Sequence, residues 1–304
     1  MYQYNIFQWL FFFYFYCFFG WCFESTYVSL KQKKLVNRGF MRGPFLPLYG
    51  TGAIMMLVVS MPFQNNVFLT YLAGVVGATI LEYITGVTME ALFKVRYWDY
   101  SNQPFNFQGQ ICLGSSIAWG FLTILMTRVV HKPIETFVLS IPMNVLTIVT
   151  SIITIYIVAD FTLSFKAAMD LRDILVKMEK AKEEMARIQR RLDVLVAFSN
   201  EGKEEKKQER ELRMNELAAS LEQRFAKAKE TVASKPLAYS ENAKEEIAEL
   251  RTRFNLYMER RKGSREMLGF YKRDMIRNNP TMVSKKFKDA FEDLKAAVNN
   301  KKES

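Results

Sequence analysis

The feature that most constrains this chain is a series of long apolar runs confined to its first half. The run from Ile6 to Phe23 is rich in aromatic residues, and the first charged side chain of the protein is Glu24. Four further apolar runs follow at about residues 45–62, 67–92, 109–130 and 134–162. Because about 20 apolar residues cross the hydrocarbon layer, the runs predict five membrane-spanning helices. The second run is short and is also compatible with a re-entrant segment.

The charged residues divide the chain into two unlike parts. Residues 1–165 contain nine Lys/Arg and six Asp/Glu, whereas residues 166–304 contain 33 and 25. This division predicts an all-α protein, with a transmembrane helical domain over 1–165 and a helical, coiled-coil domain over 166–304. Basic residues follow the first run instead of preceding it, which indicates an anchor and not a cleaved signal.

The distribution of basic residues also predicts the topology. Five lie between residues 31 and 42, two more are Lys94 and Arg96, and a large surplus follows the fifth run. These regions all lie on the cytoplasmic side if the N-terminus is outside, as the positive-inside rule requires. We therefore expect a multi-pass cell-membrane protein with a cytoplasmic C-terminal domain. His131 and Lys132 then fall in a short outer loop.

Three carboxylates are predicted to converge near the cytoplasmic side of the bundle. Glu24 ends the first span, Glu82 lies within the inner half of the third, and Glu90 follows it nearer the cytoplasm. A carboxylate inside hydrocarbon costs on the order of 3 kcal/mol, so each should face protein, water or a partner. Arg38, Arg42 and Arg96 are candidate partners. We interpret Glu90 as an interfacial salt bridge and Glu82, flanked by small residues, as a functional site.

The connection after the third span is unusually polar and aromatic. It reads KVRYWDYSNQPFNFQGQICLG, in which Asp99 lies between Trp98 and Tyr100 and amide side chains such as Asn106 follow. Either this loop meets water, or it folds back on the bundle as a pocket wall, since Trp and Tyr prefer the membrane interface.

The stretch VNRGFMRGPFLPLYGTG combines glycine, proline and arginine ahead of an apolar run. Gly43 and Pro44 are predicted to start the second span, because proline costs little in a first helical turn. Gly50 and Gly52 would then permit close helix approach. The second and fourth spans both start on the cytoplasmic side, where their positive ends favour an anion.

Several motifs together resemble a known family. GWCFEST, VNRGFMRGPFLPLYGTG, LEYITGVTMEALF, RYWDYSNQPFNFQGQICL and IAWG occur in this order between residues 20 and 120. This series resembles the putative ABC-transporter type IV permease family of bacterial membrane proteins. The Phe107-Gln108 pair departs from the more leucine-like run of that family. The resemblance implies a permease subunit that works with a separate ATPase.

The motifs and the charges together select the candidate substrate-binding residues. They are Glu24, Arg38, Arg42, Tyr49, Glu82, Glu90, Trp98, Asp99 and Asn106. The chain contains no GxxxxGK[ST] phosphate loop, and its three cysteines form no CxxC pair. We therefore expect no cofactor and no metal site, and we read the cysteines as membrane packing.

The second half shows a heptad pattern. Apolar residues fall at positions 171, 174, 178, 181, 185, 188, 192 and 195, spaced alternately by three and four. We call these positions the heptad seam. It fits a coiled-coil homodimer, which we favour, or an intramolecular helical hairpin with later helices near 204–233, 241–261, 265–277 and 282–299. Mixed charges on these helices argue against nucleic acid and favour anionic lipid.

Three functions fit these patterns. The first is a transport permease subunit for a polar or amphipathic solute, including anionic or lipid-like ones. The second is a membrane-anchored dimeric scaffold. The third is a membrane-embedded enzyme on lipid-linked substrates, with Glu82 or Asp99 as a general base and the two arginines 38 and 42 holding a phosphate. We rank the enzyme last because no nucleophile–base pair is recognisable.

Overall fold

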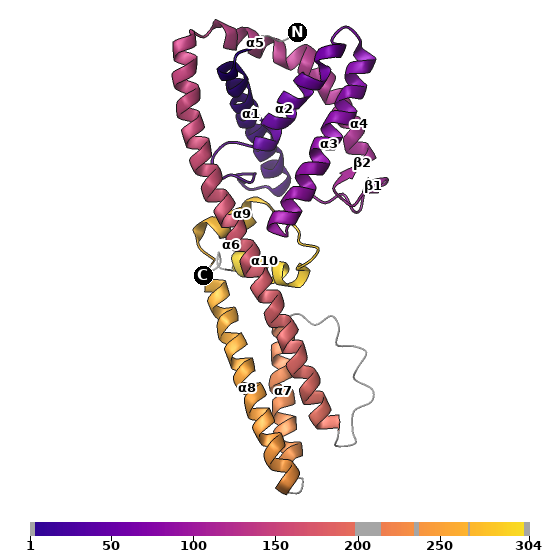
Figure 1. Cartoon of the computed structure of the whole chain (residues 1–304), viewed down its shortest axis with the longest axis vertical. Helices are drawn as coiled ribbons and strands as arrows, with labels where there is room; N and C mark the ends of the chain where they lie inside the picture. The colour runs from indigo at the N-terminus through magenta and orange to yellow at the C-terminus, as the bar shows by residue number, and fades with distance from the viewer. Residues whose placement is uncertain (1–3, 198–213, 234–236, 267, 301–304) are drawn as a thin grey trace. The chain divides into compact units, whose positions relative to one another are not determined.

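A computed structural model describes residues 4–197, 214–233, 237–266 and 268–300. These described residues are 80% helical and contain almost no strand, which confirms the predicted all-α class. The chain divides into two compact units. Figure 1 labels helices and strands that belong to them. The first contains residues 1–170 and 270–285, and the second contains 171–269 and 286–304. The units are described separately.

The first unit is built from apolar helices and a short hairpin. Its elements are α1 (Ile6–Gln32), α2 (Pro47–Ser60) with a single 3-10 turn (Met61–Phe63), α3 (Val67–Phe93), β1 (Asn106–Phe107), β2 (Ile111–Cys112), α4 (Leu113–Leu125), a π-helical turn (Met126–Val130), α5 (His131–Ser140), the start of α6 (Met143–Ala197) and α9 (Phe270–Asn278). The second unit contains the rest of α6, α7 (Met214–Ala233), α8 (Leu237–Glu266) and α10 (Lys288–Asn300).

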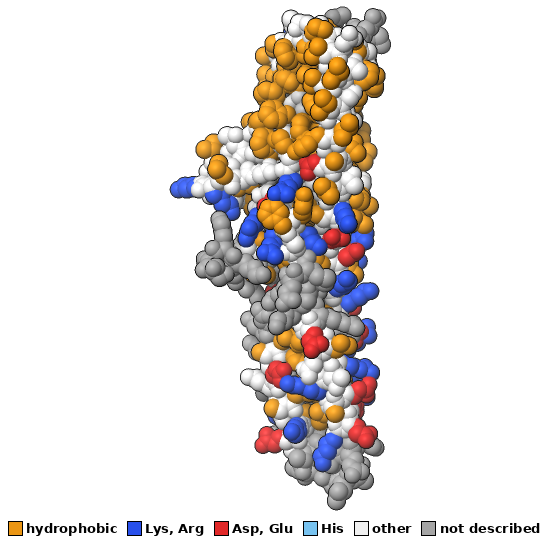
Figure 2. Space-filling model, turned by 90° about the vertical axis from the view of Figure 1, so that its left-hand side faces the viewer, with side chains coloured by type: hydrophobic (Ala, Val, Ile, Leu, Met, Phe, Trp, Pro, Cys, Tyr) orange, Lys and Arg blue, Asp and Glu red, His pale blue; other side chains and the backbone are white. Residues whose placement is uncertain are grey.

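Four helical stretches are long and apolar enough to cross a membrane. They are Ile6–Gln32, Val67–Phe93, Leu113–Ser140 and Met143–Asp193, and Pro47–Phe63 is a shorter apolar helix. On the face drawn in Figure 2, hydrophobic side chains gather over the upper part of the molecule. Many apolar side chains of the membrane-length helices are exposed, among them Phe23, Val76, Phe121 and Ile155, as lipid-facing residues of a membrane protein are.

The boundary predicted between the fourth and fifth runs is wrong. Helix continues through residues 131–133, and the chain turns at Ile141 and Pro142 before α6 begins. Pro133 follows directly on the π-helical turn Met126–Val130, where the regular i→i−4 hydrogen-bond pattern is already interrupted, so the helix continues past the proline. His131 is therefore not in a loop. It is fully buried, and both ring nitrogens contact tyrosine hydroxyls: Tyr16 at 2.7 Å from Nδ1 and Tyr4 at 3.0 Å from Nε2.

The glycine- and proline-rich stretch forms the connection between α1 and α2. The second helix begins at Pro47, which occupies its first turn, and not at Gly43-Pro44 as the sequence suggested. Gly43 instead donates its backbone N–H to Asp160 at 2.7 Å. Gly50 permits close helix approach, since a Cβ there would lie 2.7 Å from the Phe13 carbonyl oxygen of α1. Gly52 faces open space, so the predicted packing role is wrong at that position.

The core of the first unit lies among α1, α2, α3, α5 and α6. Fully or almost fully buried members include Phe12, Leu57, Ala78, Val138 and Leu146. Helix ends are fixed locally: the side chains of Asn5 and Asn66 cap α1 and α3, whose C-caps, Lys33 and Lys94, adopt the left-handed conformation. Both connections that follow, residues 33–46 and 94–112, therefore start with a sharp change of direction.

The heptad seam is covered within one chain. Met185, Ile188 and Leu192 pack with Leu221 and Phe225 of α7 and with residues of α8 in a single buried cluster. This is the intramolecular alternative, so no second chain is required to bury these described positions of the seam. Helix α8 runs through Gly263, beyond the end expected at residue 261. Of the helix predicted near 204–233, the part before Met214 lies outside the described residues.

Candidate functional site

Polar side chains gather where α1 and α3 end, around the connections 33–46 and 94–112. We call this region the polar end of the first unit. It comprises Glu24, Tyr49, Glu82 and Glu90 together with the connections 33–46 and 94–112. It contains all nine residues selected from the sequence. The structure distributes them among four groups of contacts.

The first group surrounds Glu82 of α3. This side chain is only 6% exposed, and its carboxylate accepts hydrogen bonds from three neutral donors. The Tyr100 hydroxyl lies 3.0 Å from Oε1, whereas the Trp119 indole N–H and the Ser115 hydroxyl lie 3.0 Å and 3.2 Å from Oε2. No salt bridge reaches Glu82 within the described parts of the chain. The carboxylate is thus held by three hydrogen-bond donors of the protein, with no cation of the described residues beside it.

The start of α4 explains part of this arrangement. Ser115 lies in the first turn of α4, where unpaired backbone N–H groups give a helix a partial positive charge. The sequence suggested that the starts of two spans would favour an anion. At α4 the chain's own Glu82 carboxylate lies beside that helix start, which lowers the cost of keeping it ionised in an apolar helix.

The second group joins Glu24, Arg38 and Tyr49. The Tyr49 hydroxyl donates to Glu24 Oε2 at 2.8 Å, and Arg38 Nε lies 3.5 Å from Glu24 Oε1. Glu24 is therefore a paired carboxylate that ties α1 to α2 and to the connection after α1.

The pKa of Tyr100, which donates to Glu82, is raised. Burial is the largest cause, the nearby Glu82 carboxylate comes next, and the charge of Glu24 adds to the same effect. The Tyr100 hydroxyl thus stays protonated and donates to Glu82.

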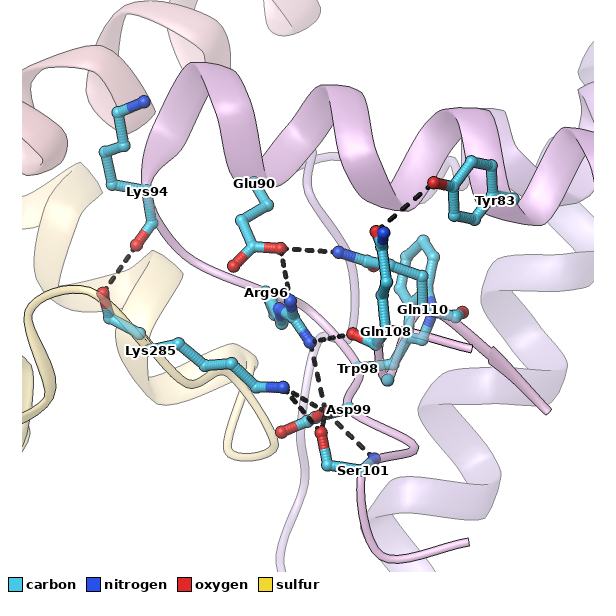
Figure 3. Close-up of polar contacts among 12 residues, drawn as sticks. Tyr83, Glu90, Lys94, Arg96, Trp98, Asp99, Ser101, Gln108, Gln110 and Lys285 are labelled. Atoms are coloured by element: carbon cyan, nitrogen blue, oxygen red, sulfur yellow. Dashed lines mark hydrogen bonds and ion pairs between the residues drawn. The ribbon is translucent and has the colours of Figure 1, made fainter. Parts of the chain in front are cut away.

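The third group is centred on Arg96 (Figure 3). This arginine is 8% exposed, and Nη2 lies 2.6 Å from Glu90 Oε2, while Nη1 lies 2.8 Å from the Gln108 carbonyl oxygen and 3.4 Å from Asp99. Gln110 also donates to Glu90 at 2.6 Å. A buried guanidinium needs this number of acceptors because an unpaired buried charge is costly. Glu90 thus serves as a salt-bridge partner for the polar loop.

The loop 94–112 folds back on itself around Arg96. The Trp98 indole donates to the Gln110 carbonyl at 3.0 Å, and the Asn106 side chain donates to Gln103 O at 2.8 Å and accepts from Gly109 N at 3.1 Å. Gly109 adopts φ +70°, and a Cβ there would lie 2.8 Å from Arg96 Nη1. Trp98 and Asn106 thus hold the loop together.

Asp99 organises the same loop. It accepts hydrogen bonds from the Ser101 hydroxyl at 2.6 Å and from the Ser101 backbone N–H at 3.1 Å. Burial opposes ionisation of Asp99, but these hydrogen bonds and the charges of Lys285 and Arg96 outweigh it and lower its pKa. Asp99 is therefore ionised at neutral pH, and its contacts are those of a loop acceptor.

The fourth group contains Arg42 and the segment that begins at Phe270. The Arg42 guanidinium lies 4.4 Å from the Phe270 ring centroid and 4.9 Å from that of Tyr271, and its Nε is 3.6 Å from Asp274. Stacking on aromatic faces is a common arrangement for arginine. Arg42 therefore contacts this distant segment and shares no described contact with Arg38, with which the sequence had grouped it.

Sequence reasoning missed several partners in this site. Ser115 and Trp119 hold Glu82 yet lie in α4, a helix whose sequence offers only the IAWG motif as a signal. Residues 270–285 were assigned to the separate C-terminal domain, and no sequence pattern connects them with the membrane half. Among the described residues, no group of three His, Cys, Asp or Glu side chains could hold a metal ion.

Comparison with known proteins gives one match. The family model described as putative ABC-transporter type IV matches residues 11–165, about half of the chain and nearly all of its apolar helices. No curated protein and no solved structure matches the chain. The matched residues include Arg96 and all nine candidate side chains. The family label indicates a transport-related role in a membrane. The chain belongs to the putative ABC-transporter type IV family.

Proposed function

We propose that this chain is the membrane-embedded subunit of a transport system and works with a separate ATPase. The family label favours ABC-type transport, and the chain has no phosphate loop with which to hydrolyse a nucleotide itself. In this proposal the N-terminus lies outside the cell and the polar end faces the cytoplasm, as the basic connections favour.

The observation that carries the proposal is the state of Glu82. Glu82 belongs to an apolar helix, and more than nine-tenths of its side chain is buried. Its carboxylate accepts hydrogen bonds from three neutral donors, and no cation of the described residues lies beside it. Helix packing alone does not require such a residue, because a carboxylate inside hydrocarbon costs on the order of 3 kcal/mol by insertion scales. A carboxylate with no cation beside it can attract a proton or the cationic part of a polar or amphipathic solute. We propose that Glu82 acts in this way during transport.

The ATPase partner gives the first test. The protein is purified from native membranes after mild cross-linking, and co-purified subunits are identified by mass spectrometry together with ATP hydrolysis by the complex. We expect a nucleotide-hydrolysing subunit in the complex. Finding none, while other membrane assemblies survive the same procedure, would contradict the proposal.

The role of Glu82 gives the second test. We expect Glu82→Gln to reduce ATP hydrolysis by the complex or the transport-dependent phenotype, while the protein still inserts and folds. Glu183→Gln is the matched control, because Glu183 is an exposed residue of α6 in the second unit. Full activity of Glu82→Gln would remove Glu82 from the mechanism.

A scaffold is the second candidate, and a specific observation favours it. Helix α6 continues without a break from Met143 to Ala197, and the second unit has a buried core of its own. Such a unit can present a surface to soluble partners. The two candidates differ at Glu82, since a scaffold tolerates Glu82→Gln whereas a transport subunit does not. Truncation discriminates less well because it also removes residues 270–285 from the first unit.

A further inference from the structure

Residues 270–285 belong to the first unit, although the residues on both sides of them belong to the second. We call this segment the strap. It comprises α9 and the non-helical residues 279–285 that follow. It lies far along the sequence from the connections that it contacts, since Thr281, for example, is 184 residues from Tyr97. The strap is therefore a return of the distant chain to the polar end.

Asn279 makes the first attachment of the strap. It is fully buried, and its amide group donates to the carbonyl oxygens of Gly39 and Met275, both at 2.9 Å. Its side-chain oxygen accepts from Arg38 Nη1 at 2.9 Å. One side chain thus binds the connection after α1 through a backbone carbonyl and through an arginine of the candidate site.

Thr281 extends this attachment to the other connection. Its hydroxyl accepts from Arg38 Nη2 at 2.8 Å and donates to the Tyr97 carbonyl at 2.9 Å. Arg38 lies in the connection 33–46, whereas Tyr97 lies in the connection 94–112. Thr281 therefore bridges the two connections through a single hydroxyl group.

The end of the strap binds the connection 94–112 along its backbone. Arg96 and Val283 exchange two backbone hydrogen bonds, at 2.7 Å and 2.9 Å. The Ser284 hydroxyl donates to the Lys94 carbonyl at 2.6 Å, and the Lys285 ammonium group lies 2.7 Å from the Ser101 hydroxyl (Figure 3). These contacts hold the end of the strap next to Arg96, on which the third group of contacts is centred.

We propose that the strap is a detachable clasp that holds the two connections of the polar end together, and that its release opens the polar end. The clasp relies on side-chain and backbone hydrogen bonds, supplemented by the buried side chains of Met275, Ile276 and Met282. Each of these hydrogen bonds contributes only modestly, so the loss of one of them can shift the balance between an attached and a released state.

The position of the strap in the chain gives the clasp a source of control. It is joined at both ends to residues of the second unit, so a change in that unit can reach the polar end through the backbone. This inference does not rest on the proposed transport, because opening of the polar end is measured without a solute or an ATPase.

Cys112 provides a reporter for opening. It is a free cysteine, 7% exposed, at the start of α4 and the end of the connection 94–112. The experiment uses the full chain in lipid nanodiscs with Cys17→Ala and Cys22→Ser, so that Cys112 is the only thiol. The rate of its modification by a water-soluble maleimide is compared among three forms: the parent, Asn279→Ala and the control Asn278→Ala. Asn278 is adjacent, and the structure shows no side-chain hydrogen bond for it among the described residues.

We expect Asn279→Ala to accelerate modification of Cys112 about tenfold, because loss of a charge-assisted bond of about 1.4 kcal/mol or more shifts the open fraction by that factor. Asn278→Ala should leave the rate unchanged. Thr281→Val, which keeps the shape and removes one bridging hydroxyl, should accelerate the reaction less. Equal rates for Asn279→Ala and Asn278→Ala would overturn the proposal.

A matching reporter distinguishes opening from unfolding. In a background with Cys22→Ser and Cys112→Ser, only Cys17 remains, and it is fully buried between α1 and α2. We expect its rate to stay unchanged in Asn279→Ala and in Thr281→Val. Acceleration at Cys17 in both variants would also overturn the proposal, since the strap would then be part of the fold of the bundle and not a clasp.

Discussion

Substitutions of Glu82 separate the energetic role of the side chain from the role of its charge. Oε1 of Glu82 contacts Tyr100, and Oε2 contacts both Ser115 and Trp119. A glutamine can keep its oxygen towards Trp119 and Ser115 and turn its amide group towards Tyr100, whose hydroxyl can accept. Glu82→Gln should therefore preserve all three contacts.

Glu82→Ala removes every acceptor at once. The two hydroxyl groups can rotate towards other acceptors, but the Trp119 indole is a donor only and stays unsatisfied. A buried donor without a partner costs about 1–3 kcal/mol, and the lost side-chain packing adds to this cost. We expect a destabilisation of about 2–4 kcal/mol, which lowers Tm by roughly 5–12 °C for a unit of this size.

The assay is thermal unfolding of the purified protein in one detergent, with all variants scanned at the same rate because membrane proteins often unfold irreversibly. Glu82→Gln should lie within about 2 °C of the parent, a shift that corresponds to less than about 1 kcal/mol. If Glu82→Gln proved as unstable as Glu82→Ala, the charge itself would be needed for folding, and the hydrogen-bond account would be wrong.

Three further predictions follow from the loop and from the second unit. The pKa of Asp99 is lowered in the folded protein, so ionised Asp99 stabilises the fold at pH values above its ordinary pKa. This stabilisation is lost as pH falls through the lowered pKa. Asp99→Asn should therefore flatten the decline of Tm below about pH 4. A decline as steep in the variant as in the parent would exclude this role. Gly109→Ala should cost about 1–2 kcal/mol through its positive φ, with further crowding against Arg96, and unchanged Tm would contradict the loop conformation. Leu221→Ala should cost about 2–5 kcal/mol and increase hydrogen exchange in α7 and α8 while α1 and α3 stay protected; equal increases in both units would contradict two separate cores.

The membrane helices could be predicted because their signal is local. Long apolar runs, with Asn5 and Asn66 at their starts, determine where α1 and α3 lie within a few residues. The boundary near His131 was missed because Pro133 reads as a break in sequence, whereas the π-helical turn just before it lets the helix continue. The start of α2 was predicted too early, at Gly43 and Pro44. A proline does occupy the first turn of this helix, but it is Pro47.

The partners within the site could not be predicted because they depend on tertiary contacts. The spacing of Glu82 in α3 indicated its depth, but nothing in the sequence indicated that Ser115 and Trp119 of α4 would meet it. The heptad seam predicted burial correctly at positions such as Met185 and Leu192, whereas periodicity alone could not say which helix would cover them. The strap was missed because its contacts are single hydrogen bonds, such as those of Asn279, which leave no periodic pattern.

The most direct measurement is a density map of the protein in a lipid nanodisc at a resolution that shows side chains around Glu82. The account predicts the carboxylate in contact with Trp119 and Tyr100, inside protein and with no arginine beside it. Density for acyl chains against Glu82, or an arginine side chain in contact with its carboxylate, would contradict it.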